Sequence, residues 1–252
     1  MEKRNLYGTW VTTKLIAHRG FHDNNSDAPE NSLAAFKLAI ENGYAMEMDV
    51  QMSSDGVLVV FHDDTLNRVC GVDGKIAATP IEELKKLHLY NSNEQIPTME
   101  EFLNLVDGKE PILIEVKDHA NIGELEQKLT DMLHNYKGEF IIESFNPFII
   151  KWFYQNAPEF VRGQLSTDFK NEKMAWYKKF LLRHMIFNKS NHSEFIAYDV
   201  RDIKRPQIKR IKKKMPVLMW TVRKPEEINE YREYFDNIIF QDFKPRDFFN
   251  EK

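Results

Sequence analysis

Residues 15–51 read LIAHRGFHDNNSDAPENSLAAFKLAIENGYAMEMDVQ, and this stretch decides the fold. Residues 15–17 predict one strand and residues 45–51 a second. Between them, Asn31 or Ser32 is expected to cap a helix whose apolar residues repeat at helical spacing until a glycine ends it. A strand, a helix and a strand in this order predict two parallel strands joined by a covering helix.

The same alternation continues to the end of the chain. Helices are predicted between most strands, notably at 122–136, 147–156 and 203–214. The pattern indicates an α/β fold, and 252 residues suit a single-domain TIM-type (β/α)8 barrel, which typically takes about 250. Strands are predicted at nine places: 15–17, 45–51, 57–62, 112–116, 140–144, 161–165, 195–200, 217–222 and 237–240.

Two regions depart from a simple eight-strand pattern. The turn at residues 53–56 leaves no room for a helix between the second and third predicted strands, so this link is irregular or one strand lies outside the barrel. Glycines and prolines interrupt residues 64–99, where only 81–87 looks helical. We therefore expect a small inserted subdomain at about 64–99 within one domain spanning 1–252.

Composition and charge exclude several classes of protein. With 35 Lys and Arg against 39 Asp and Glu, the chain has a net charge of −4, which argues against a nucleic-acid partner. Cys70 is the single cysteine, so neither an intramolecular disulfide nor a cysteine-rich metal site can form. Residues 1–14 contain no apolar stretch of signal-peptide length, and no apolar run could cross a bilayer. We expect a cytoplasmic protein.

Three carboxylates lie at predicted strand positions from which they could bind one metal ion. Glu47 and Asp49 are two residues apart and share a face of their strand, and Glu115 lies near the end of another. Gathered in one pocket they would repel each other, and a hard cation such as Mg²⁺ or Ca²⁺ would compensate. The alternative is that they are solvent-facing charges on an edge strand, paired with lysines.

Histidines and cations occupy comparable positions. His18 and His62 each end an apolar strand, and a histidine pair can supply a base and an acid near neutral pH. Arg19 and Lys117 would provide the positive charge that a phosphate requires. Together with a hard metal, these residues point to phosphoryl chemistry.

An ordered set of motifs closely resembles the glycerophosphodiester phosphodiesterases and covers the chain from Leu15 to about Pro245. The matching segments are Ile16-Ala17-His18-Arg19-Gly20, Pro29-Glu30-Asn31-Ser32, Glu47-Met48-Asp49-Val50, Asp55-Gly56 before Val60-Phe61-His62-Asp63, Thr65-Leu66-Asn67-Arg68, Ile96-Pro97-Thr98-Met99, Glu115-Val116-Lys117, Ser144-Phe145 and Trp220-Thr221-Val222.

The resemblance implies a barrel with a small insertion and metal-dependent hydrolysis of glycerophosphodiesters to sn-glycerol 3-phosphate and an alcohol. By matching motif, Mg²⁺ or Ca²⁺ would be bound by Glu47, Asp49 and Glu115. The acid/base pair would be His18 and His62, with His18 favoured as base by analogy. Arg19 and Lys117 would contact the phosphate. Gln241 stands where family members commonly have threonine.

Other features leave alternatives open. Trp220 is either a substrate-binding residue or part of the core. The basic run at 204–214 is either a solvated helix or a patch that makes weak contact with anionic membrane lipid.

Two rival functions also remain. One is a lysophospholipase D acting at the same site, with an apolar lid for the acyl chain formed by Leu84, Leu87, Leu89 and Tyr90. The other is a non-catalytic barrel that binds phosphodiesters.

Overall fold

The computed structural model describes residues 4–170 and 172–245. Its strands are β1 (Ile16–Ala17), β2 (Ala45–Met52), β3 (Leu58–Val60), β4 (Ile112–Val116), β5 (Phe140–Ser144), β6 (Arg162–Ser166), β7 (Phe195–Asp199), β8 (Val217–Val222) and β9 (Asn237–Phe240). They follow the order β1-β9-β8-β7-β6-β5-β4-β2-β3, with an additional pairing of β1 with β2. The order is that of a TIM-type (β/α)8 barrel with β3 appended, which confirms the predicted fold class.

The chain divides into two compact units. One runs from Ala17 to Phe140, and the other takes in the chain up to Ile16 and from Ile141 onward. The helices of the first unit are α2 (Leu33–Glu41), α3 (Asn67–Cys70), α4 (Ile81–Leu84), α5 (Met99–Val106) and α6 (Glu124–His134), with a 3-10 turn at Ile76–Ala78.

In the Ala17–Phe140 unit, β2 is the central strand and pairs with β4 in parallel and with β3 in antiparallel orientation. The antiparallel pairing explains the ninth predicted strand. A tight turn, in which the Gly56 amide donates to the Ser53 carbonyl, returns the chain directly beside β2. The extra strand therefore lies outside the parallel barrel, one of the two arrangements that the sequence left open.

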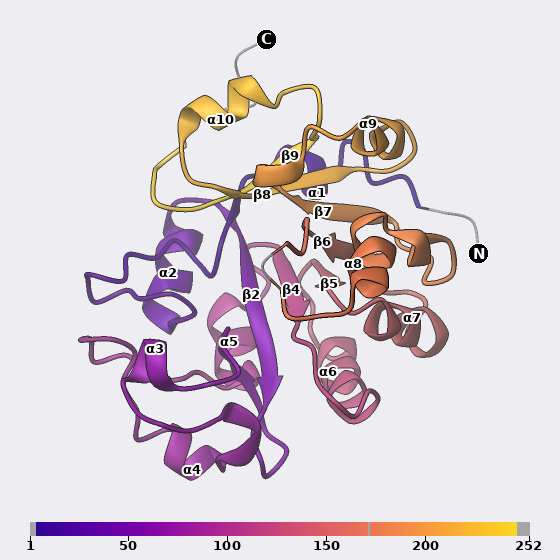
Figure 1. Ribbon diagram of the computed structural model, residues 1–252. Helices are drawn as coiled ribbons and strands as arrows, with labels where there is room; N and C mark the ends of the chain where they lie inside the picture. The colour runs from indigo at the N-terminus through magenta and orange to yellow at the C-terminus, as the bar shows by residue number, and fades with distance from the viewer. Residues whose placement is uncertain (1–3, 171, 246–252) are drawn as a thin grey trace. The chain divides into compact units, whose positions relative to one another are not determined.

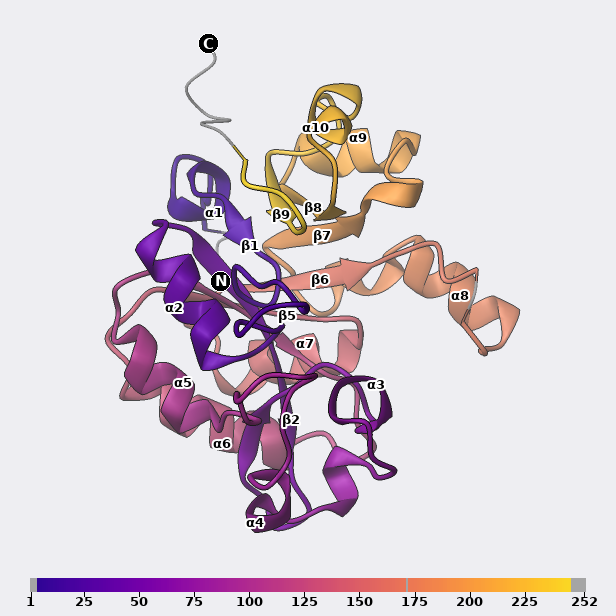
Figure 2. The same cartoon turned by 90° about the vertical axis from the view of Figure 1, so that its left-hand side faces the viewer.

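Helix α2 begins where its sequence predicts. Ser32 caps it by accepting a hydrogen bond from the Ala35 amide, so Ser32, and not Asn31, is the N-cap. Phe36 of α2 and Phe102 of α5 pack edge-on with ring centroids 4.5 Å apart, which fixes these two helices side by side (Figure 2).

Apolar side chains of residues 64–99, the expected inserted subdomain, pack in one cluster with Val59 of β3 and with Phe61. The predicted helix at 81–87 is the single turn α4. Leu87 and Tyr90 pack against a cluster that includes Leu84 and Leu89, both completely buried, so these residues form an interior and not the exposed lid suggested for a lysolipid chain. The other members of the cluster are Val59, Phe61, Leu66, Val69, Ile76 and Ile96.

The second unit contains an all-parallel ladder in which each strand from β5 to β9 pairs with the next (Figure 1). The helix predicted at 203–214 is shorter than expected, because Pro206 begins α9 and the helix ends at Lys212. Its helices are α1 (Trp10–Thr13), α7 (Pro147–Asn156), α8 (Trp176–Arg183), α9 (Pro206–Lys212) and α10 (Pro225–Glu230), with 3-10 turns at Ile186–Lys189 and Val200–Asp202.

Candidate active site

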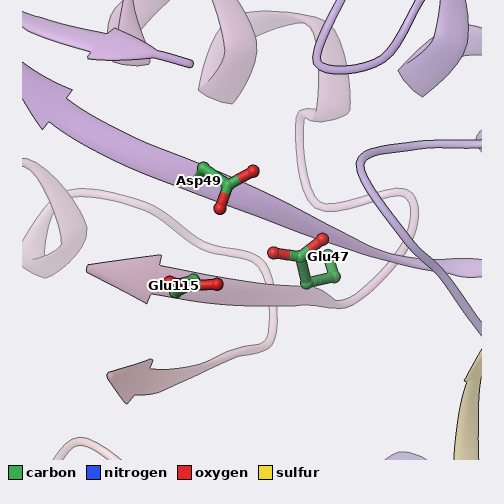
Figure 3. A group of neighbouring side chains, drawn as sticks. All are labelled: Glu47, Asp49 and Glu115. Carbon is green, nitrogen blue, oxygen red and sulfur yellow. The ribbon is translucent and has the colours of Figure 1, made fainter. Parts of the chain in front are cut away.

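Three carboxylates face one another on β2 and β4. Asp49 lies opposite Glu115 in the parallel register, and Glu47 shares the face of Asp49 because alternate residues of a strand point the same way. Figure 3 shows Glu47, Asp49 and Glu115 on these two strands, turned toward a common space. Their oxygen atoms come within 4.8 Å of one another and all three residues are buried, so they are not solvent-facing charges on an edge strand.

Two cations accompany the three carboxylates. Lys117 Nζ lies 2.8 Å from Glu115 Oε1 and 3.4 Å from Asp49 Oδ1, and Arg19 Nε lies 3.5 Å from Asp49 Oδ2. Burial alone would raise the pKa of Asp49, but nearby positive charge, that of Lys117 foremost, holds the pKa of this carboxyl well below its ordinary value. Asp49 therefore stays ionised in the interior.

The carboxylate cluster retains capacity for a cation. Among the described residues, no group donates a hydrogen bond to Asp49 Oδ1. The three carboxylates have two cationic partners, Lys117 and Arg19, and Arg19 is also paired with Glu30. A buried all-oxygen donor set of three carboxylates fits a hard divalent ion.

The turn after β1 brings His18 and Arg19 to the same carboxylates. The Arg19 amide donates a hydrogen bond of 2.8 Å to Glu47 Oε2, and His18 Nε2 lies 4.0 Å from that oxygen. Arg19 has a left-handed backbone, with φ of +53°. Gly20 follows at φ of +79°, where a Cβ would meet the Ala35 carbonyl carbon of α2 at 2.9 Å. Glycine is required because the turn passes so close to the helix.

His62 is held by its neighbour in the chain. His62 Nδ1 lies 2.6 Å from Asp63 Oδ1, and Arg68 donates to both oxygens of Asp63 at 2.7 and 2.8 Å. A carboxylate accepts the Nδ1 proton, which leaves Nε2 as the ring nitrogen for proton transfer. Gln51 supports this loop by donating to the Asp63 and Phe61 carbonyls.

The sequence analysis missed the charge network behind the site. Glu30 is buried and accepts hydrogen bonds from Arg19, Arg68, Asn24 and Tyr90. Burial acts to raise the pKa of Glu30, but the hydrogen bonds from Arg68 and the charge of Arg19 outweigh it and hold that pKa well below the ordinary value. Glu30 and Arg68 were quoted within motifs, but no local pattern pairs residues so far apart in the chain.

Asn31 contacts the carboxylate cluster, a contact that was not predicted from the sequence. Its Nδ2 donates a 2.8 Å hydrogen bond to Asp49 Oδ2, from a left-handed backbone with φ of +58°. Asparagine tolerates this conformation better than most residues, which accounts for its place immediately before the helix cap.

A cavity of about 560 Å³ opens beside Lys117. The end of β2 and the residues after it, the residues after β4, and Asp64, Lys75 and Ala77 line this cavity. His119 lines it and is held in place, with Nδ1 at 2.9 Å from the Lys117 carbonyl and Nε2 at 3.2 Å from Glu126 Oε1. No Phe, Tyr or Trp side chain of the described residues lines this space.

Comparison with known proteins decides the family. The model of the glycerophosphoryl diester phosphodiesterase family matches residues 18–244. The chain belongs to this family. Glycerophosphodiester phosphodiesterases are hydrolases, and family membership makes this chain an enzyme of the same class.

Individual relatives agree with that placement. The chain is 35% identical over 166 residues to the glycerophosphodiester phosphodiesterase of Caldanaerobacter subterraneus subsp. tengcongensis. The aligned region covers 62% of this chain and 67% of the relative. The chain is 31% identical over 168 residues to the glycerophosphodiester phosphodiesterase of Bacillus altitudinis, with the same coverage. An Oleispira antarctica phosphodiesterase, solved with the product sn-glycerol-3-phosphate, superposes with a TM-score of 0.74 at 26% identity and covers 90% of this chain and 92% of that one.

Seven of the eight residues that the sequence nominated lie in the Ala17–Phe140 unit. These are His18, Arg19, Glu47, Asp49, His62, Glu115 and Lys117. Trp220 is on β8 in the other unit, where its ring packs edge-on against Phe145 at 5.5 Å. Its indole Nε1 is buried and finds no hydrogen-bond acceptor among the described residues. A role for Trp220 in substrate binding stays a prediction.

Proposed function

We propose that this enzyme hydrolyses glycerophosphodiesters to sn-glycerol 3-phosphate and an alcohol at the site formed by β2, β4 and the loops after β1 and β3. The observation that carries the proposal is the buried carboxylate cluster, contacted directly by Arg19 and Lys117 and flanked by His18. The Oleispira antarctica relative, which holds sn-glycerol-3-phosphate, supports the identity of the product.

Glu47, Asp49 and Glu115 are the residues that would hold a divalent cation, Mg²⁺ or Ca²⁺. When bound, such an ion supplies positive charge to the phosphoryl oxygens as negative charge develops on them. Lys117 and Arg19 act in the same direction. Lys117 is held by a hydrogen bond to Glu115 of the cluster, and Arg19 by one to Glu30. Each has further N–H groups with which to contact the phosphate.

His18 and His62 transfer the protons. In the proposed step His18 takes the proton from the attacking oxygen, which belongs to water or to the neighbouring glycerol hydroxyl. Attack by the hydroxyl gives a cyclic phosphate, which water must then open to give sn-glycerol 3-phosphate. As the new P–O bond forms and the bond to the alcohol breaks, His62 Nε2 gives its proton to the departing oxygen. Asp63, beside Nδ1, keeps the ring oriented.

The departing alcohol has space beside Lys117. The cavity there is lined by polar groups, including Gln51, Ser53, Lys75 and Asn121, and by apolar side chains such as Met52 and Leu125. The polar groups would hydrogen-bond the hydroxyls of an alcohol group. The lysolipid alternative loses its structural support, because the leucines proposed for its lid pack in the apolar cluster of the inserted subdomain.

Replacement of one histidine tests the proposal. We expect His62→Ala to lower turnover of glycerophosphocholine by about 10²–10⁴-fold, the usual contribution of one acid or base. His88→Ala, which removes an exposed histidine of the same compact unit, is the matched control and should retain wild-type turnover. Wild-type turnover by folded His62→Ala would refute the assignment.

A further inference from the structure

Helix α8 presents large apolar side chains to solvent. Trp176 is 79% exposed, Tyr177 50% and Phe180 51%. Ile186, in the 3-10 turn that follows, is 50% exposed. Figure 2 shows α8 beyond the carboxyl end of β6, the strand that precedes it. No residue of α8 itself is buried.

These side chains form one patch. Phe180 is four residues after Trp176 and three after Tyr177, so the three lie on neighbouring positions of one helix face. The Trp176 and Tyr177 ring centroids are 6.2 Å apart. A contiguous exposed apolar patch marks an interaction site, because apolar side chains in contact with water are stabilised when a partner covers them.

The segment that carries the patch is basic. Residues 172–189 contain five basic residues and one acidic residue, in a chain whose overall net charge is −4. Within the described part of the chain, Lys173, Lys178 and Lys189 form no ion pair, whereas Arg183 is paired with Asp202. Exposed aromatic rings among unpaired lysines are complementary to a surface that is apolar beneath and negative at its boundary.

The basic run at 204–214, which the sequence analysis considered for membrane contact, differs in this respect. Lys204 pairs with Glu230, and Lys209 pairs with Glu233. Lys212 lies 3.6 Å from Asp236. These acidic neighbours therefore offset three of the seven positive charges of the run, and none of its described residues is an exposed aromatic.

We propose that the α8 patch, comprising Trp176, Tyr177, Phe180 and Ile186 with Lys173, Lys178 and Lys189, docks on the surface of an anionic lipid bilayer. The aromatic rings enter the headgroup region and the lysines attract anionic headgroups. The contact is peripheral, since no helix in the described part of the chain is long and apolar enough to span a membrane.

Docking would place the enzyme near the source of its substrate. A glycerophosphodiester is what remains of a glycerophospholipid after both acyl chains have been removed, so a deacylation reaction at the membrane must supply it. This consequence rests on the proposed function, whereas the docking itself does not.

Co-sedimentation with vesicles tests the proposal. We expect the protein to bind vesicles containing phosphatidylglycerol and to bind phosphatidylcholine vesicles at least tenfold more weakly. Trp176→Ala with Phe180→Ala, or Lys178→Glu alone, should weaken binding by about tenfold or more. Lys214→Glu makes the same charge change in the basic run and should retain binding.

Hydrolysis of water-soluble glycerophosphocholine separates the docking from the catalytic proposal. All α8 variants should retain wild-type turnover of this substrate in the absence of vesicles. An inactive wild-type protein that still binds vesicles would overturn the proposed function alone.

Equal loss of binding in Lys178→Glu and Lys214→Glu, or no binding to anionic vesicles, would overturn the docking. So would a wild-type dimer that the paired Trp176→Ala and Phe180→Ala changes convert to a monomer, because the patch would then be covered by a second copy of this chain.

Discussion

Asp63 is predicted to act on the reaction only through His62. Its Oδ1 lies 2.6 Å from His62 Nδ1 and accepts the proton on that nitrogen, which orients the ring so that Nε2 can donate a proton in the proposed step. Asp63→Asn keeps the shape of the side chain and removes the charge. A hydrogen bond to a charged group contributes about 1.5–3 kcal/mol, so turnover should fall by roughly 10- to 150-fold.

The fold should survive this substitution. Arg68 loses its pairing with Asp63 but still donates two hydrogen bonds to Glu30, at 2.6 and 3.0 Å. Circular dichroism and urea unfolding should therefore show a folded protein. Asp27→Asn, at an exposed carboxylate of the same unit, is the matched control for the loss of one negative charge.

The assay is release of sn-glycerol 3-phosphate at saturating glycerophosphocholine, for wild type, Asp63→Asn, His62→Ala and the double variant. Because Asp63 works through His62, the double variant should be no slower than His62→Ala alone. Turnover of Asp63→Asn within twofold of wild type would show that the contact of Asp63 with His62 does not contribute to the reaction. A double variant slowed by the product of the two single effects would do the same.

Three further predictions concern stability and reactivity. Gly20→Ala should destabilise the protein by more than Gly43→Ala. At both positions alanine would have to adopt a left-handed backbone, which costs about 1–2 kcal/mol, but only at Gly20 would the new Cβ also meet a helix carbonyl. Urea unfolding measures the difference, and equal effects would contradict the close approach. Burial raises the pKa of the Cys70 thiol to about 11, so at pH 8 only about a thousandth of the thiol is ionised to thiolate. A disulfide reagent should therefore label native protein far more slowly than protein unfolded in urea. Equal labelling rates would contradict this prediction. The contact with Glu126 raises the pKa of His119 above its ordinary value of 6.5. The stabilisation that charged His119 provides is therefore complete below pH 6.5 and is lost as the pH rises through the raised pKa. The stability difference between wild type and His119→Gln should be larger at pH 6 than at pH 9, and a difference independent of pH would show that the charge has no part in it.

The barrel could be predicted because its signals are local. Apolar strand segments, helix caps and turn residues each lie within a few positions of one another, and they determined the order of elements correctly. The orientation of β3 could not be predicted in the same way, because its apolar residues would suit a parallel or an antiparallel neighbour. Only the short turn at 53–56 pointed to the observed hairpin.

The site was predictable in part for the same reason. The spacing of Glu47 and Asp49 places both on one face of a strand, but the contacts of Glu30 with Arg68 and Tyr90 join residues 38 and 60 positions apart. Helix α8 was not among the helices predicted, and its apolar face is exposed in the structure. The residues that sequence analysis missed are those whose partners come together only after folding.

The central claim is that the buried carboxylates hold a divalent cation on which hydrolysis depends. Its most direct test is release of sn-glycerol 3-phosphate from glycerophosphocholine by purified protein, first stripped of divalent ions by a chelator and then supplied with Mg²⁺ or Ca²⁺. We predict that release stops on chelation and returns with at least one of the two ions. Undiminished release by the stripped protein, or no release from folded protein with either ion, would contradict the claim.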